Sequence, residues 1–156
     1  MSVISFKSVG VTPKFIEESV VETSPIPIGI KTPLQLDSTG KNFFIMNFEL
    51  EDQISDNLRN LLQTNWGERL GQFFFGANLR PLTTEFVSQD NFDAEAVIRI
   101  KNSVSAWMPF IDLIDFLSEI DRLENKSTGV IKINITYNIP SLQVFNKKIQ
   151  TVLYVL

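Results

Sequence analysis

Carboxylates are the side chains of this sequence from which a catalytic pair could be built, because the 156 residues include neither histidine nor cysteine. Their absence excludes nucleophiles activated by histidine, thiolate metal sites, iron–sulfur clusters and disulfides. A glycosidase needs two carboxyl groups roughly 5–10 Å apart, one of them with a raised pKa. Glu68, together with Asp112 or Asp115, is the pair that the sequence offers.

The same residues have a structural interpretation, which we favour. Glu68 and Arg69 follow a predicted helix, where hydrogen bonds and an ion pair between them can hold a loop. Asp112 and Asp115 fit the solvent-facing side of a strand. Nothing in the spacing brings two of these carboxyls together or buries one of them. We therefore expect no catalytic residue and no enzymatic activity.

Metal, nucleic-acid and membrane binding are not expected either. The acidic run Glu49–Asp52 begins a predicted helix, whereas a calcium loop places its oxygen ligands around a glycine turn. We predict no metal and no cofactor. The net charge is −4, without a basic aromatic surface that would bind nucleic acid. No run of 18 apolar residues could span a membrane, and the N-terminus does not resemble a signal peptide.

Charge is distributed unevenly along the chain. The first 124 residues carry 10 basic and 18 acidic side chains, whereas the remainder has no acidic residue and four lysines, at positions 126, 132, 147 and 148. Such a division is typical of a protein whose two ends contact different partners. Lysines on an edge strand also prevent unwanted strand pairing, and composition does not separate the two interpretations.

Two amphipathic helices are expected in the middle of the chain. The first covers about residues 52–64, where one isoleucine and three leucines recur at helical spacing. The second covers about residues 92–107, and its buried stripe ends in Trp107, shortly before Pro109. These two helices are the elements that must position the loop containing Glu68.

Residues 1–42 are expected to form an extended N-terminal arm. Prolines occur at positions 13, 25, 27 and 33, and they exclude a helix over residues 24–30. The isoleucines of residues 26–30 alternate with proline and glycine, as in a segment laid on an apolar surface. That surface is either the protein's own core or a neighbouring chain, and we expect the arm to be docked on or exchanged with a neighbour.

The remainder of the sequence predicts an antiparallel sheet. Residues 131–137 alternate apolar and polar side chains, residues 138–141 provide a turn, and residues 145–156 form another strand. Residues 111–121 fit a strand or a helix, and we favour a strand. The predicted fold class is α+β, with two main helices packed on a C-terminal antiparallel sheet and residues 43–156 forming a single domain.

A loop rich in glycine and phenylalanine connects the two helices. Residues 67–76 contain three glycines, which indicate bends of the backbone, and three adjacent phenylalanines, which need apolar neighbours. We interpret the phenylalanines as part of the packed core rather than as the lining of a ligand pocket.

The last strand is the feature that points to a partner. Residues 145–156 end the sequence and become apolar on both faces. Such a strand offers unpaired N–H and C=O groups to another chain unless it is covered, and strand addition is a common mode of protein recognition. The alternative is that the N-terminal arm covers it.

The middle of the chain resembles a known family. Residues 60–69, 75–79 and 107–111 resemble, in order and spacing, the baseplate wedge protein of contractile-tailed bacteriophages. This family is sometimes labelled lysozyme-like, initiates the tail sheath and recurs in type VI secretion. The resemblance covers about residues 54–156. The residues that match the family pattern are Gly67, Glu68, Arg69, Phe75, Gly76, Trp107 and Pro109.

The resemblance implies a structural protein with six copies around the tail, located in the virion at the tail baseplate and assembled in the bacterial host cytoplasm. The implied partners are the tail sheath protein, other baseplate wedge proteins, and tail tube or hub proteins. Gly67, Glu68, Arg69, Phe75 and Gly76 would form the structural loop.

The resemblance also implies two contact regions. A sheath strand would pair with the C-terminal sheet, which it is expected to meet at Lys147, Ile149, Thr151, Leu153 and Val155. The family docks on the helical core of the wedge through a glutamate–proline–arginine motif. Here that motif is replaced by Met108, Pro109 and Phe110, so docking at Trp107, Met108, Pro109 and Phe110 would be apolar.

Two alternatives to a sheath initiator in a phage baseplate stay open. One is a muramidase-type cell-wall hydrolase that depends on Glu68 and an aspartate. The other is a baseplate subunit of a type VI secretion system, which shares the proposed mechanism.

Overall fold

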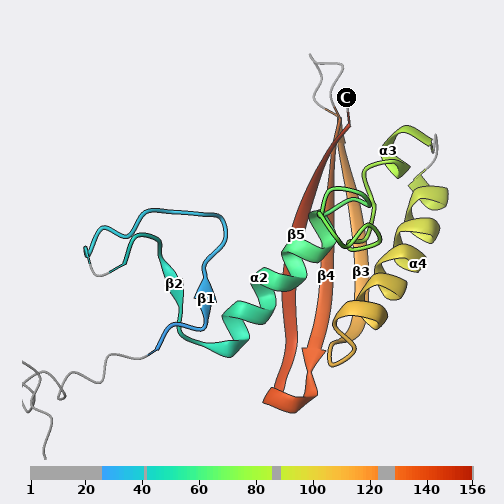
Figure 1. Ribbon diagram of the computed structural model, residues 1–156. Coiled ribbons are helices and arrows are strands. Elements are labelled where there is room, and N and C mark those ends of the chain that lie inside the picture. Colours follow the sequence, from blue (N-terminus) through green and yellow to red (C-terminus); the bar gives the residue numbers. More distant parts are fainter. Residues whose placement is uncertain (1–25, 41, 86–88, 123–128, 156) are drawn as a thin grey trace, which may run out of the picture.

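The computed structural model describes residues 26–40, 42–85, 89–122 and 129–155. Its main body is a three-stranded antiparallel sheet with helices on one face, and a two-stranded hairpin stands beside that body (Figure 1). The elements in chain order are β1 (Gly29–Ile30), β2 (Met46–Asn47), α2 (Leu50–Gln63), α3 (Leu82–Glu85), α4 (Gln89–Trp107), β3 (Asp112–Arg122), β4 (Gly129–Ile139) and β5 (Val144–Val155).

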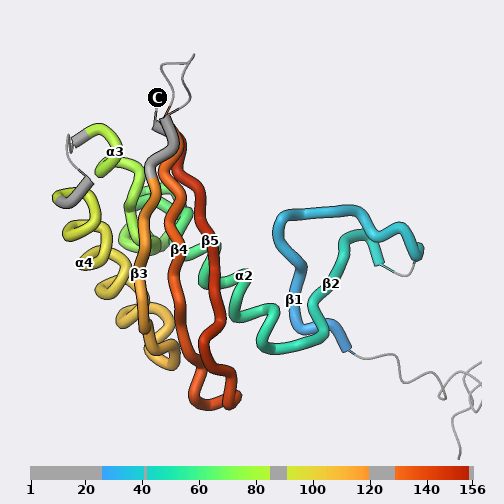
Figure 2. The backbone as a smooth tube through the Cα atoms, turned by 180° about the vertical axis from the view of Figure 1, so that it is seen from behind, coloured from blue at the N-terminus to red at the C-terminus, as the bar shows by residue number. Residues whose placement is uncertain are grey.

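The sheet has the strand order β3-β4-β5, so β3 and β5 each have an edge that pairs with no strand of the described chain. The helices α2 and α4 lie together on one face, and the opposite face carries neither of them (Figure 2). The predicted α+β fold, with two main helices on a C-terminal antiparallel sheet, is confirmed. Residues 111–121, which fitted either a strand or a helix, fall almost entirely in β3.

Alternation along β4 determines which face the helices cover. Ile131, Ile133, Ile135 and Tyr137 are at most 5% exposed, while the residues between them are partly exposed. The hydroxyl of Tyr137 lies 2.7 Å from the hydroxyl of Ser55 on α2, so the polar end of this buried side chain is hydrogen-bonded. Removal of this apolar face from water is the main contribution that attaches the helices to the sheet.

The helix α2 packs through the apolar stripe that the sequence predicted. Leu58, Leu61 and Leu62 are no more than 1% exposed. Glu51 and Asp52 lie in the first turn of the helix, where its N-terminal partial positive charge favours carboxylates.

The helix α4 buries Ile100 and Val104 as predicted, but Trp107 at its end is 39% exposed rather than part of the buried stripe. No helix in the described segments is long and apolar enough to cross a membrane.

The loop between the helices bends at its glycines. Gly67 and Gly76 have positive φ angles of 84° and 110°. A Cβ atom on Gly76 would lie 2.1 Å from the carbonyl oxygen of Thr64, so a side chain cannot be accommodated there without movement of the backbone. This confirms the interpretation of these glycines as sites of backbone bends.

The expectation that the three phenylalanines are core residues is wrong for two of them. Phe73 and Phe74 are 61% and 68% exposed, and Phe75 alone packs against the core. Backbone hydrogen bonds of the loop explain the difference. The N–H of Gly67 donates to the carbonyl of Phe73 at 2.8 Å, and this contact closes the loop on itself at the surface rather than over the core.

Residues 26–40 and 42–47 form a hairpin in which β1 pairs with β2 and Leu36 bridges to Phe44. The hairpin stands beside the start of α2, away from the covered face of the sheet (Figures 1 and 2). Residues 1–25 of the expected arm lie outside the described residues. The expected boundary after residue 42 falls within this hairpin, and the division into an arm and a domain stays a prediction.

Asp56 on α2 fixes the hairpin. Its carboxylate accepts hydrogen bonds from the N–H of Thr32 at 2.9 Å and the side-chain amide of Asn47 at 2.8 Å, and it pairs with Arg59 at 2.9 Å. Burial alone would raise the pKa of Asp56. The hydrogen bonds from Thr32 and Asn47 and the charge of Arg59 outweigh burial and hold the pKa below its ordinary value of 3.8. The ionised carboxylate therefore connects β2 and the segment that follows β1 to the helix.

Candidate functional site

The open edge of β5 is the candidate functional site. The strand pairs with β4 along its length, from Val144 opposite Ile139 to Val155 opposite Gly129, and with no other strand in the described part of the chain. Successive residues of a strand direct their N–H and C=O groups to opposite edges. Every second residue of β5 therefore presents unpaired backbone groups, to which another extended chain can add.

The predicted strand-pairing residues have side chains that face the helices. Ile149 and Thr151 are 4% and 1% exposed, and the ammonium group of Lys147 contacts the carboxylate of Glu51 on α2. The side chain of Val155 lies outside what the structure describes. A strand added to β5 would therefore contact the backbone of these residues. Their role stays a prediction, and it concerns Lys147, Ile149, Thr151, Leu153 and Val155.

The side chains of β5 that remain accessible were not selected from the sequence. They lie on the uncovered face of the sheet, and the period of two along the strand is the signal that could have identified them. Once Ile149 is assigned to the core, its neighbours in the strand must face the other way. These residues are Lys148, Gln150, Val152 and Tyr154.

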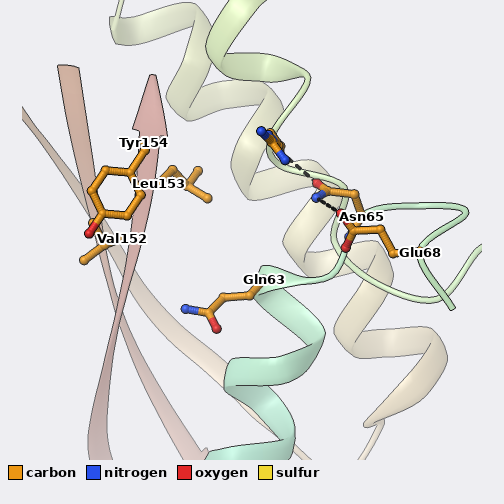
Figure 3. Close-up of a pocket in the computed structure, with 7 residues that line it drawn as sticks. Gln63, Asn65, Glu68, Val152, Leu153 and Tyr154 are labelled. Carbon is orange, nitrogen blue, oxygen red and sulfur yellow. Dashed lines mark hydrogen bonds between the residues drawn. The ribbon is translucent and has the colours of Figure 1, made fainter. Parts of the chain in front are cut away.

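A cleft of about 350 Å³ lies beside the C-terminal half of β5 (Figure 3). Residues 152–154 of β5 form one of its walls. The other wall comes from the end of α2 and the loops that follow it, and it is polar. Its side chains are those of Gln63, Asn65, Glu68 and Arg80.

Glu68 in this cleft is held by hydrogen bonds. Its two carboxylate oxygens accept the side-chain amide and the backbone N–H of Asn65, both at 2.8 Å. These bonds and the positive charge of Arg80 hold the pKa of Glu68 below its ordinary value of 4.5. The catalytic acid of a glycosidase needs a raised pKa, whereas the pKa of Glu68 is lowered. The arrangement therefore favours a structural role for this carboxylate.

The structure does not bring the three candidate carboxylates into one cleft. Glu68 is the only acidic residue among the described residues that line its cleft. Asp115 lines a different cavity between α4 and β3, and both Asp112 and Asp115 are exposed on β3. In the segments that the structure describes, no group of three acidic side chains could hold a metal ion.

Arg69 forms no ion pair with Glu68, contrary to our expectation. Its guanidinium lies 3.9 Å from the ring centre of Phe75, a cation–π contact, and that ring meets Trp107 edge to face with the centroids 5.1 Å apart. The structural loop and the predicted docking segment are therefore one continuous surface.

The predicted docking residues differ in exposure. Met108 is 6% exposed and belongs to the core, whereas Trp107 and Phe110 are 39% and 44% exposed, and Pro109 is exposed as well. Trp107, Met108 and Phe110 line a cleft of about 360 Å³ together with Arg69 and Phe75. A partner at this surface would meet two aromatic rings and one guanidinium.

The fold defined by these elements, two helices on one face of a three-stranded antiparallel sheet, is found in solved structures of tail and baseplate proteins. A chain of the anti-feeding prophage baseplate, a structure with six-fold symmetry, matches over 70% of this chain and 82% of its own length, with 20% identity and a TM-score of 0.55. A protein from Geobacter sulfurreducens described as a "putative tail lysozyme" matches over 70% and 93%, with 20% identity and a TM-score of 0.53.

No protein-family model and no curated protein matches the chain. At 20% identity the likeness to the two solved structures defines the fold. The structural neighbours of this chain are thus a baseplate component and a tail protein, which agrees with the resemblance that the sequence indicated.

Proposed function

We propose that this protein is a structural subunit of a contractile-tail baseplate that starts assembly of the tail sheath. A strand of the first sheath subunit would add to the open edge of β5. Its partners would be the tail sheath protein, other baseplate wedge proteins, and tail tube or hub proteins. Six copies would surround the tail in the virion, after assembly in the cytoplasm of the bacterial host.

The open edge of β5 carries this proposal. It is already paired to β4 over its whole length, so its unpaired backbone groups are held in the geometry of a strand. An incoming segment would have to order only itself, which lowers the entropic cost of the first contact in a polymer. The likeness of the fold to a chain of a six-fold baseplate supports the same role.

Docking on the wedge would use the surface around Trp107. Exposed aromatic rings and arginine are the side chains that most often dominate protein–protein interfaces. Trp107 and Phe110 provide the rings here, and Arg69 provides the guanidinium. This surface and the edge of β5 involve different residues, so the protein could bind a wedge partner and a sheath subunit at the same time.

Catalysis is not part of the proposed function. The lowered pKa of Glu68 and the lack of a second carboxylate among the described residues of its cleft both disfavour hydrolysis of a glycoside.

Amide hydrogen exchange tests the proposal with the intact chain. Deletion of β5 would be a poor test because Ile149 and Thr151 are buried in the core. In the free protein, every second amide of β5 should exchange rapidly, since it faces no strand. Addition of the purified sheath protein from the same particle should protect this set, while amides of β4 should stay as they were.

Two results would contradict the proposal. One is unchanged exchange along β5 in the presence of a sheath protein that polymerises. The other is protection confined to the edge of β3. The sheath protein used would also distinguish a phage tail from a type VI secretion system, because each has its own sheath.

A further inference from the structure

A second cleft lies along the N-terminal half of β5, between that strand and the hairpin. Its volume is about 350 Å³. The segment Lys31–Pro33 of the hairpin forms one wall, residues Lys147–Ile149 of β5 form the other, and side chains of α2 lie between the two walls. Figure 2 shows the start of α2 between β5 and the hairpin. The open edge of β5 therefore borders a channel with a second wall.

The second wall is held in a fixed position. Asp56 on α2 binds Thr32 and Asn47, which belong to the two sides of the hairpin. Arg59 completes this contact, since its guanidinium reaches both Asp56 and the carbonyl of Thr32. One of these bonds is buried and the others are partly buried, so the hairpin is fixed relative to the helix.

The charges that line the cleft are not balanced. Arg59 is paired with Asp56, and Lys147 contacts Glu51 and lies 3.9 Å from Asp52. The remaining cations are Lys31 on the hairpin wall and Lys148 on the β5 wall. Neither forms an ion pair with any residue that the structure describes. The described lining therefore has four cations and two carboxylates, Asp52 and Asp56, and Lys148 lies where the cleft meets the uncovered face of the sheet.

We infer that the segment received by β5 is an extended chain with carboxylate side chains, and that the hairpin acts as the second wall of its binding channel. This inference rests on the proposed function. The backbone of the segment would pair with β5, and its acidic side chains would pair with Lys31 and Lys148. Backbone hydrogen bonds alone would accept any extended chain. The positive charges beside β5 would favour a segment with acidic side chains.

An apolar segment fits this cleft poorly. Among the described residues that line it, Pro33 and Ile149 alone are apolar, and the rest are charged or polar. An apolar segment laid there would remove Lys31 from water and would give neither Lys31 nor Lys148 a partner, which costs free energy. A segment with carboxylates avoids that cost.

Charge reversal in the full-length chain tests the inference. The double substitution Lys31→Glu/Lys148→Glu should slow nucleation of purified sheath protein by roughly tenfold at low salt, because surface charges act chiefly on the rate of association. Lys31→Arg/Lys148→Arg keeps both charges and should nucleate normally. Lys101→Glu, on the exposed side of α4, reverses one charge away from the cleft. It changes the net charge by half as much as the double variant and should nucleate normally. Circular dichroism should show the same fold for all variants.

The outcomes separate the inference from the proposed function. The inference is supported if only the double Glu variant nucleates the sheath more slowly and if its nucleation rate depends less on salt than that of the wild type. Normal nucleation by that variant overturns it and leaves the role of β5 in place. If the wild-type chain fails to nucleate the sheath, the proposed function and this inference both fall. Equal loss with Lys101→Glu also overturns the inference, because the effect would then follow net charge.

Discussion

A single carboxylate, that of Asp56, connects the hairpin to α2 through Thr32, Asn47 and Arg59. Removal of the charge by Asp56→Asn should lower the free energy of unfolding by about 2 kcal/mol at neutral pH, because three donors lose an ionised acceptor. Urea unfolding of both proteins measures the difference. Asp112→Asn changes an exposed carboxylate of β3 and should alter stability little.

The contribution of Asp56 also predicts a dependence on pH. The pKa of this carboxyl is below its ordinary value of 3.8 in the folded protein, so folding favours the ionised form. The stabilisation is complete above the ordinary pKa and is lost as the pH falls below 3.8 towards the folded value. The difference between wild type and Asp56→Asn should therefore shrink in acid. A difference that stays constant down to pH of about 2 would contradict this assignment.

Glu68 is predicted to be structural rather than catalytic. The variant Glu68→Gln keeps one oxygen that can accept from Asn65 and should fold with a slightly lower Tm. Neither wild type nor variant should clear a suspension of bacterial cell walls. Clearing by the wild-type protein that disappears in Glu68→Gln would instead support the hydrolase.

The loop between α2 and α4 should depend on glycine at position 76 for its stability. Gly76→Ala combines a φ of 110° with a Cβ placed 2.1 Å from the carbonyl oxygen of Thr64, so we expect a loss of about 3 kcal/mol or more. Gly71→Ala is the matched control. It has a similar φ of 79° but open space around the Cβ, and it should cost about 1 kcal/mol. Equal destabilisation of the two variants in thermal unfolding would show that the contact with Thr64 is relieved.

The helices and strands could be predicted because each carries the period of its own geometry. The stripe of α2 and the alternation of β4 are local signals, and both matched the structure. The short helix α3 was not predicted, since its four residues are too few to show a period. Exposure of Phe73 and Phe74 was missed because the hydrogen bonds that close their loop leave no pattern in composition.

The candidate site could be predicted only in part, for a related reason. The strand β5 was recognised as a pairing strand because it follows a hairpin partner and becomes apolar on both faces. The channel beside it depends on contacts between residues more than twenty positions apart, such as Thr32 with Asp56. No local pattern places Lys31 across the cleft from β5, so a role for Lys31 could not be predicted from the sequence.

At the scale of the whole molecule, residues 107–110 should affect stability and assembly through different side chains. Met108→Ala removes a buried side chain and should lower the free energy of unfolding by about 3 kcal/mol. Phe110→Ala changes a side chain that is 44% exposed and should leave stability nearly unchanged while it weakens binding to the wedge partners. Thermal unfolding and co-purification with baseplate proteins measure the two effects. If the Phe110→Ala variant still co-purified with the wedge partners, Phe110 would not be part of the interface.

The two open edges of the sheet differ in charge: the edge of β3 is acidic, and the edge of β5 borders basic side chains. The strand β3 carries the exposed carboxylates Asp112, Asp115 and Glu119, whereas β5 borders the cleft between Lys31 and Lys148. An acidic segment that is attracted to β5 is repelled by β3. If the proposed strand addition takes place, it would thus extend this sheet at the edge of β5 and not at the edge of β3.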